Sequence, residues 1–287
     1  MSSNTLIGAR TLAGLAEGGL VAVATELIAR SRRAERIGGY FVTLQTLAQC
    51  ALALLLALYA VPAAGAAGGF VALGVVCLLS LVVAWIVPDD YADLPKDEHF
   101  ANVLTLPAIT ALLSIFCYFM FFGAVWAFLE PLGAEFGIDG RTVGLMVSAS
   151  LAAQVMGAMT ATVFEARIDY RFAITVIGAI ATISSVLLAS GPGLLVFWSV
   201  AMVMGFILLF IVPYQIRLAI TADETRNAVL LVPAAQLFGL AIGPVAASLL
   251  IDGQNFRPVP EFAAASALAS VALLGVFVLV ARRRVPA

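Results

Sequence analysis

The chain has 287 residues, of which 63% are hydrophobic and 11% are charged, and its formal net charge at pH 7 is −2. A soluble domain has about 45–50% apolar and about 25% charged residues, so this composition excludes a water-soluble globular protein. Without a basic stripe, nucleic acid is not expected as a partner. The three cysteines lie inside apolar stretches without paired spacing, so we expect neither disulfides nor a metal site.

Nine apolar stretches are long enough to cross the hydrocarbon core of a bilayer, which takes about 20 helical residues. We predict transmembrane helices over residues 7–29, 38–60, 67–87, 105–129, 142–164, 172–190, 193–216, 228–251 and 261–281. Strands are excluded because an open strand in lipid leaves its backbone groups unpaired. Turn-forming residues separate several spans, at 61–69, 190–193 and 252–260. The predicted fold class is an all-α polytopic membrane protein with nine transmembrane helices.

Basic residues alternate along the junctions between these spans. Of the 15 Lys and Arg residues, twelve lie in the odd-numbered junctions and the C-terminal tail, two lie in the even-numbered junctions, and one lies inside the first span. Basic loops favour the cytoplasmic side, which predicts a plasma (inner) membrane protein with a cytoplasmic C-terminus and an outer N-terminus. The loop charges singled out are Arg33, Arg36, Asp169, Arg171 and Arg226.

An internal similarity divides the chain in two. Residues 29–49 resemble residues 219–239, because both are a basic loop entering a helix that carries a glutamine. Parallel repeats of this kind relate the two halves of one large class of transporters. The acidic junction after the third span is the longest. We therefore predict a three-helix block at 1–88, a cytoplasmic connector at 89–104 and a six-helix block at 105–287.

Three segments carry a resemblance to a known family. The segment RTLAGLAEGG at 10–19 has an arginine followed by glycines at helical spacing, ARSRRAERIGG at 29–39 is a basic loop, and 121–158 pairs an aromatic-rich helix with a helix of small residues. In these features the chain resembles the major facilitator superfamily of secondary transporters. The resemblance implies a partial fold, with three helices of the N-terminal bundle, a complete C-terminal bundle, and the family's first three helices lacking.

The chain departs from the family pattern at two places. The counterpart of the family's best loop signature falls at 164–172, where only Asp169 between two arginines matches. The glycine-proline motif of the family's antiporters is missing from 38–60. A similar pattern lies in the eighth span, where we expect it to shape helix packing: Gly239, Gly243 and Pro244. Proton-drug antiport is therefore not expected.

The first span carries two ionisable residues, Arg10 and Glu17, seven positions apart on one helical face. Ionisable groups inside a membrane usually face a cavity or a partner. The resemblance implies that this helix lines the central pathway, so both residues are candidates for substrate or proton binding. The alternatives are that Arg10 reaches the outer interface and that Glu17 makes a packing contact. Gly14 and Gly18 either allow close helix packing or leave room for a ligand.

Further polar or aromatic side chains inside the spans are candidates for the pathway. Buried amides need hydrogen-bond partners, so we expect them to point inward, as links between helices or as substrate contacts. Trp126 is either an anchor at the outer interface or a stacking wall for substrate. The glutamines concerned are Gln45, Gln49, Gln154 and Gln236.

The predicted function is secondary transport of a small solute by alternating access, with the lipid bilayer and a small-molecule substrate as partners, with or without a coupling proton. No nucleotide-binding loop, metal cluster or nucleophile motif is present in the sequence, so we expect neither an enzyme nor a cofactor. One alternative is an inactive fragment, because a chain lacking three helices would expose Arg10 and Glu17 to lipid; on that basis we expect the 287 residues alone not to transport. The other is a membrane-embedded assembly or enzyme subunit.

Overall fold

The computed structural model describes residues 3–31, 33–86, 105–223, 227–253 and 255–282. Within these residues the fold is entirely helical apart from turns and one isolated β-bridge between Asp252 and Asn255. The all-α prediction is therefore confirmed for the described part of the chain. The predicted connector at 89–104 lies outside the described residues, and the domain boundaries stay a prediction.

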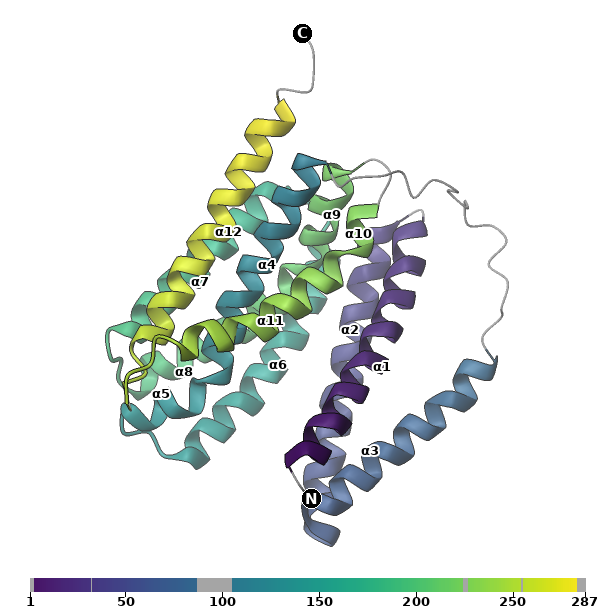
Figure 1. Ribbon diagram of the computed structural model, residues 1–287, viewed down its shortest axis with the longest axis vertical. Coiled ribbons are helices and arrows are strands. Elements are labelled where there is room, and N and C mark those ends of the chain that lie inside the picture. Colours follow the sequence, from purple (N-terminus) through teal and green to yellow (C-terminus); the bar gives the residue numbers. More distant parts are fainter. Residues whose placement is uncertain (1–2, 32, 87–104, 224–226, 254, 283–287) are drawn as a thin grey trace.

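The helices form two groups in space (Figure 1). The N-terminal group consists of α1 (Ser3–Arg30), α2 (Ala34–Leu55), the π-helical segment η1 (Leu56–Ala60) and α3 (Val61–Ile86). The C-terminal group consists of α4 (Leu106–Ala127), α5 (Leu129–Glu135), α6 (Gly140–Phe164), α7 (Tyr170–Ala189), α8 (Leu194–Phe210), α9 (Val212–Ala222), α10 (Asn227–Leu230), α11 (Val232–Ser248) and α12 (Pro258–Arg282). We call the second group the six-helix block, because α8 with α9 and α10 with α11 each make one span.

Six helices among the described residues are long and apolar enough to cross a membrane, and all six belong to the six-helix block. The predicted count of nine is not confirmed. The apolar stretches described in the N-terminal group are shorter than a membrane span, at Leu12–Thr25 in α1 and Ala67–Ser80 in α3. Helix α1 carries two arginines and two glutamates, and α3 is broken at Ala64 and Gly65, where the φ of Gly65 is 64°.

Helix α4 lies at the centre of the six-helix block, between α11 and α12. Its contact with α11 depends on glycines. A Cβ atom on Gly239 would lie 2.5 Å from the backbone oxygen of Phe116, and one on Gly243 would overlap the backbone oxygen of Met120. In return, a Cβ atom on Gly123 of α4 would lie 2.7 Å from the oxygen of Leu240. The backbones of the two helices therefore touch, as small residues at membrane helix interfaces allow.

A second reciprocal contact joins α6 and α8. A Cβ atom on Gly157 of α6 would overlap the backbone oxygen of Phe206, and one on Gly205 of α8 would overlap the backbone oxygen of Ser150. The Ser150 hydroxyl, which is buried, donates a hydrogen bond of 2.9 Å to the oxygen of Ala201. Glycine contacts therefore join both α4 to α11 and α6 to α8, and the Ser150 hydrogen bond adds a polar link between α6 and α8.

Helices α4 and α12 are joined by two buried serines. Ser114 Oγ donates to the Ser270 oxygen at 2.8 Å, and Ser270 Oγ donates to the Ser114 oxygen at 2.7 Å. We expect Ser114→Ala and Ser270→Ala each to lower the free energy of unfolding by about 0.6 kcal/mol, and by at most about 1.7 kcal/mol. Denaturant unfolding of the detergent-solubilised protein would measure these losses. Because the two serines bond each other, the loss in the double variant should differ from the sum of the two single losses. The exposed Ser248→Ala, whose hydroxyl bonds within its own helix, is the control; losses equal to this control would contradict the expectation.

Helix α3 stands apart from the rest of the described chain (Figure 1). It contacts η1, and its apolar side chains are largely exposed, including Trp85 at 95%. Its turn from α2 uses the predicted turn-forming residues near Gly65. The six-helix block therefore holds most of the packed core, and the N-terminal group contacts it through α1 and α2.

Candidate functional site

Helix α2 lies against α6 and α9 at a contact that depends on two adjacent glycines. A Cβ atom on Gly39 would lie 2.7 Å from Thr162 Oγ1 of α6, and one on Gly38 would lie 2.7 Å from Ile216 Cδ1 of α9. One turn further along α2, Thr43 Oγ1 lies 3.4 Å from Thr162 Oγ1. We call these five residues the inter-block contact.

The two threonines of the inter-block contact are held by their own helices. Thr43 Oγ1 donates to the Gly39 oxygen at 2.8 Å, and Thr162 Oγ1 donates to the Ala158 oxygen at 2.8 Å. Each hydroxyl hydrogen is thus used within its helix, and the 3.4 Å approach between the two oxygens is a weak additional link.

Among the described residues, the two groups of helices meet at one end. Along α1 the exposed fraction falls from 74% at Leu20 to 7% at Ile28. Along α2 the order is reversed, because Gly38, Gly39 and Thr46 are buried, whereas after Thr46 the described side chains are exposed or half-buried. Figure 1 shows the C-terminal end of α1 and the N-terminal end of α2 close to α9 and α10. The described groups are therefore closed at this end and separate toward the other.

Beside the inter-block contact, a buried tyrosine lies near two arginines. The guanidinium of Arg171 lies 5.4 Å from the centre of the Tyr170 ring, and its Nε donates to the Tyr170 hydroxyl at 3.0 Å. The guanidinium of Arg217, next to Ile216 in the sequence, lies 5.9 Å from the same ring. The contact of Arg217 with Tyr170 links α9, one of the two helices on which α2 packs, to the start of α7.

An amide pair links α9 and α11 in the six-helix block. Gln236 Nε2 donates to Gln215 Oε1 at 3.1 Å; Gln215 is buried and Gln236 is half-buried. Gln236 thus has a hydrogen-bond partner within the six-helix block, Gln215, which the sequence reasoning missed. Gln154 is buried on α6. Trp126 is partly buried, and its ring stacks on Phe122 with 5.3 Å between centres.

Among the predicted polar residues of the N-terminal group, those whose side chains the structure describes are exposed. Gln45 and Gln49 are exposed on α2 instead of buried, and Glu17 is exposed on α1. Arg10 lies in α1, but its side chain is outside the described part of the structure. A Cβ atom on Gly14 or Gly18 would meet no atom within 4 Å, so no described neighbour requires a glycine at these positions.

The predicted loop charges are not gathered in one site. Arg33 is exposed, and Arg36 Nε donates to the Tyr40 hydroxyl at 3.1 Å. Asp169 is the N-cap of α7, where its carboxylate accepts the backbone amide of Arg171 at 2.8 Å. This cap satisfies backbone donors that the helix leaves open. Arg226 lies outside the described residues. In the part of the chain that the structure describes, no group of His, Cys, Asp and Glu is placed to hold a metal ion.

Sequence reasoning missed the inter-block contact. Gly38 and Gly39 belong to the basic segment that carried the family resemblance, yet their packing role depends on Thr162 and Ile216, which are more than a hundred residues away. Adjacent glycines inside a helix, which cost helix stability, are the one signal that was present in the sequence.

A comparison with known protein families identifies the family of the chain. A family model described as the Major Facilitator Superfamily matches residues 111–287, which is more than half of the chain. The chain belongs to the Major Facilitator Superfamily. The match to this superfamily covers most of α4 and all of α5–α12, and it confirms the predicted resemblance. Members of the Major Facilitator Superfamily are membrane transporters. No curated protein matches the sequence.

Proposed function

We propose that the activity of this chain is secondary transport of a small solute by alternating access. The observation that carries the proposal is the inter-block contact, which joins α2 to α6 and α9 at one end and leaves the other end of α1 and α2 exposed. Two bodies that touch at one end only have the geometry required for rocking around a site between them. In this proposal the substrate enters from the open end.

The basic residues beside the inter-block contact support an orientation. Arg33 and Arg36 lie next to the closed end, and the positive-inside rule favours the cytoplasm for such loops. We infer an integral plasma (inner) membrane protein whose C-terminus is cytoplasmic and whose structure corresponds to an outward-facing form. Opening would require α2 to leave Thr162 and Ile216, and closure of the other end would bring α1 toward the six-helix block.

The exposed polar side chains of α1 and α2 are the proposed wall of the pathway on one side. They are Glu17, Gln45 and Gln49, with Arg10 as a further candidate on the same helix as Glu17. On the six-helix block the corresponding candidates are Trp126, Gln154 and Gln236. A coupling proton, if transport uses one, would be carried by Glu17, because it is the ionisable residue among those with described side chains.

A second candidate is an inactive chain. It is favoured by the exposure of Glu17 and by the open space around Gly14 and Gly18, because a membrane helix with an ionisable residue requires a polar neighbour or water. The two candidates differ in whether any solute crosses the membrane.

The test is a reversible lock at the inter-block contact. Thr43→Cys and Thr162→Cys would be combined in a background with Cys50, Cys77 and Cys117 replaced by alanine, and the protein reconstituted into vesicles. We expect oxidation to join the two sites, since their hydroxyl oxygens lie 3.4 Å apart, and to reduce uptake at least tenfold by holding one end shut. Reductant should restore uptake. The measurement is uptake of radiolabelled sugars, amino acids and organic acids, with and without a proton gradient.

The control pair is Ala48→Cys with Ser148→Cys, both on exposed positions of the same two helices beyond the contact; we expect no cross-link there in this form. Uptake that continues unchanged through a fully cross-linked Thr43–Thr162 pair would exclude alternating access at this contact. If the unmodified protein takes up none of the solutes, the inactive chain is the correct reading.

A further inference from the structure

An apolar groove lies between α7 and α8 on the surface of the six-helix block. Its volume is about 330 Å³, at the lower end of the range of about 300–1,000 Å³ for small-molecule sites. Most of its lining side chains are apolar and exposed, and both helices belong to membrane-spanning segments. The groove therefore opens toward the hydrocarbon region of the bilayer. The apolar side chains along its two walls include Ile180, Ile183 and Leu187 of α7 and Leu195, Val196 and Val203 of α8.

The groove lies away from the inter-block contact. Helices α1 and α2 pack on α6, α9, α10 and α11, whereas both walls of the groove come from α7 and α8. A ligand in the groove is therefore independent of the proposed transport pathway.

The floor of the groove carries a serine whose hydroxyl has no partner. Ser184 lines the groove and is 5% exposed, and no described residue bonds its hydroxyl. The threonines of the same helix differ: Thr175 and Thr182 each donate to the carbonyl oxygen four residues earlier, at 2.7 and 2.9 Å. A buried hydroxyl without a hydrogen bond costs free energy. Ser184 is therefore a point at which a ligand in the groove would gain a hydrogen bond.

A second hydroxyl lines the opposite wall of the groove. Ser199 Oγ donates to the Leu195 oxygen at 2.9 Å, so its hydrogen is used and its lone pairs remain available. Ser184 can still both donate and accept. A ligand hydroxyl can accept from Ser184 and donate to Ser199, whereas an ester or ether oxygen can only accept. The pair of serines therefore favours an alcohol.

The depth of Ser184 in the membrane also distinguishes an alcohol from a phospholipid. Helix α7 has 20 residues, or about 30 Å at 1.5 Å per residue, which matches the thickness of the hydrocarbon layer. Ser184 comes five residues before Ala189, the last residue of α7, so it lies about 8 Å from that end. A phospholipid carries its ester groups at the boundary of the hydrocarbon layer and presents only methylene groups at this depth.

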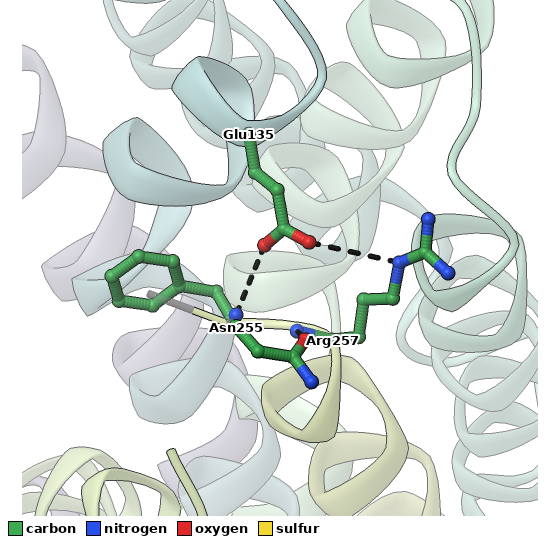
Figure 2. Close-up of polar contacts among 4 residues, drawn as sticks. Glu135, Asn255 and Arg257 are labelled. Carbon is green, nitrogen blue, oxygen red and sulfur yellow. Dashed lines mark hydrogen bonds and ion pairs between the residues drawn. The ribbon is translucent and has the colours of Figure 1, made fainter. Parts of the chain in front are cut away.

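The charges beside the groove favour an uncharged occupant. Among the described residues that line it, none is charged. Arg257 approaches the turn between α7 and α8, where a Cβ atom on Gly191 would lie 3.9 Å from its Nη2. Figure 2 shows that Arg257 has another partner: its Nε lies 3.6 Å from Glu135 Oε1. Glu135 Oε2 in turn accepts the backbone amide of Phe256 at 2.9 Å. The charge of Arg257 is thus paired outside the groove.

We propose that the groove binds one uncharged amphiphile, an alcohol with a single apolar chain. The chain lies between α7 and α8, and its hydroxyl accepts from Ser184 and donates to Ser199. Lipid tails are as apolar as the walls of the groove, so the chain alone gives no preference over the surrounding lipid. The two hydrogen bonds supply the preference, because an alkane of the same length cannot make them.

The test is photolabelling of the whole chain, reconstituted into phosphatidylcholine vesicles, with an octanol that carries a diazirine. Mass spectrometry of the peptides locates the label, which we expect on the facing residues of α7 and α8. Unlabelled octanol should compete at about three- to tenfold lower mole fraction in the membrane than octane, the effect of a net gain of one hydrogen bond. Octyl methyl ether, which accepts but cannot donate, should compete less well than octanol.

Two pairs of variants test the two parts of the site. Ser184→Ala should remove most of the advantage of octanol over octane. Its matched control is Ser185→Ala, since Ser185 also has a buried hydroxyl without a hydrogen bond but does not line the groove. Ser199→Phe fills the groove and should abolish the labelling of α7 and α8. Its matched control is Ser148→Phe on α6, since each serine is exposed and bonds the oxygen four residues earlier in its helix.

Equal competition by octanol and octane in the unmodified protein would overturn the proposal, and so would label spread evenly over the six spans. The same holds if Ser184→Ala keeps the advantage of octanol, because the hydroxyl would then be bound elsewhere. An equal loss in Ser185→Ala would show a general effect of α7 and would also overturn the proposal. Labelling of α7 and α8 that persists in Ser199→Phe would exclude the groove as the place of the chain.

Discussion

Replacing Gly243 by leucine is expected to destabilise the six-helix block by about 3 kcal/mol or more, the upper end of the cost of overpacking. A Cβ atom at this position would overlap the backbone oxygen of Met120, and its next nearest neighbours are also backbone atoms of Met120. Helix backbone atoms cannot relieve the overlap by a change of rotamer, as the end of a flexible side chain can. Helix α11 must therefore move from α4, which breaks the neighbouring contact of Gly239 with Phe116.

The measurement for Gly243→Leu is thermal unfolding in detergent, followed by the loss of monodisperse protein. For a protein of this size, a cost of about 3 kcal/mol lowers the melting temperature by roughly 10 °C. The control is Gly275→Leu in α12, because a Cβ atom there meets no atom within 4 Å and the position is exposed. Equal melting temperatures for the two variants would contradict the close contact between α4 and α11.

Replacing Gly39 by leucine is expected to open the inter-block contact while the six-helix block stays folded. The added side chain meets Thr162, which is β-branched and therefore stiff at its first torsion, 2.7 Å from the new Cβ. A cost of about 1–3 kcal/mol to the closed form shifts the equilibrium between closed and open forms by about 5- to 150-fold.

Accessibility of a single cysteine measures this shift. Thr162→Cys, in the background without native cysteines, should react with a membrane-impermeant maleimide several times faster when Gly39→Leu is also present. Ala48→Leu on the exposed part of α2 adds a similar volume without a described neighbour to meet and should leave the rate unchanged. If Gly39→Leu leaves both the labelling rate and the Thr43–Thr162 cross-link as they were, α2 does not close this end by glycine packing.

Hydrophobic length and turn chemistry suffice to predict most of the six-helix block. The spans predicted at 105–129, 142–164 and 172–190 each agree with a described helix to within a few residues, because an apolar stretch bounded by turn residues has few alternatives in lipid. The span predicted at 193–216 is less regular. It divides at Ile211, immediately before α9, whose second residue is Pro213. Proline lacks the amide that a continuous helix requires, and its effect on direction depends on packing.

The polar candidates show the limit of reasoning from one sequence. Gln45 and Gln236 occupy corresponding places in the internal repeat, and both were expected to be buried. The structure gives Gln236 a partner in Gln215 and leaves Gln45 exposed. A helical pattern identifies a polar residue inside a span. Whether another helix lies close enough to bond its amide depends on how distant segments of the chain pack, which the local pattern does not contain.

The sequence by itself determined the class of protein, the all-helical fold, the six spans after residue 105 and the family, because these follow from local apolar length and from motifs read along the chain. The tertiary structure decided which glycines carry packing: Gly239 and Gly243 meet backbones of α4, while Gly14 and Gly18 meet no described atom. It also decided that Gly38 and Gly39 meet side chains of α9 and α6, Ile216 and Thr162. The physical reason is that a glycine has no side chain, so its role is set entirely by the atoms that approach it from elsewhere in the chain.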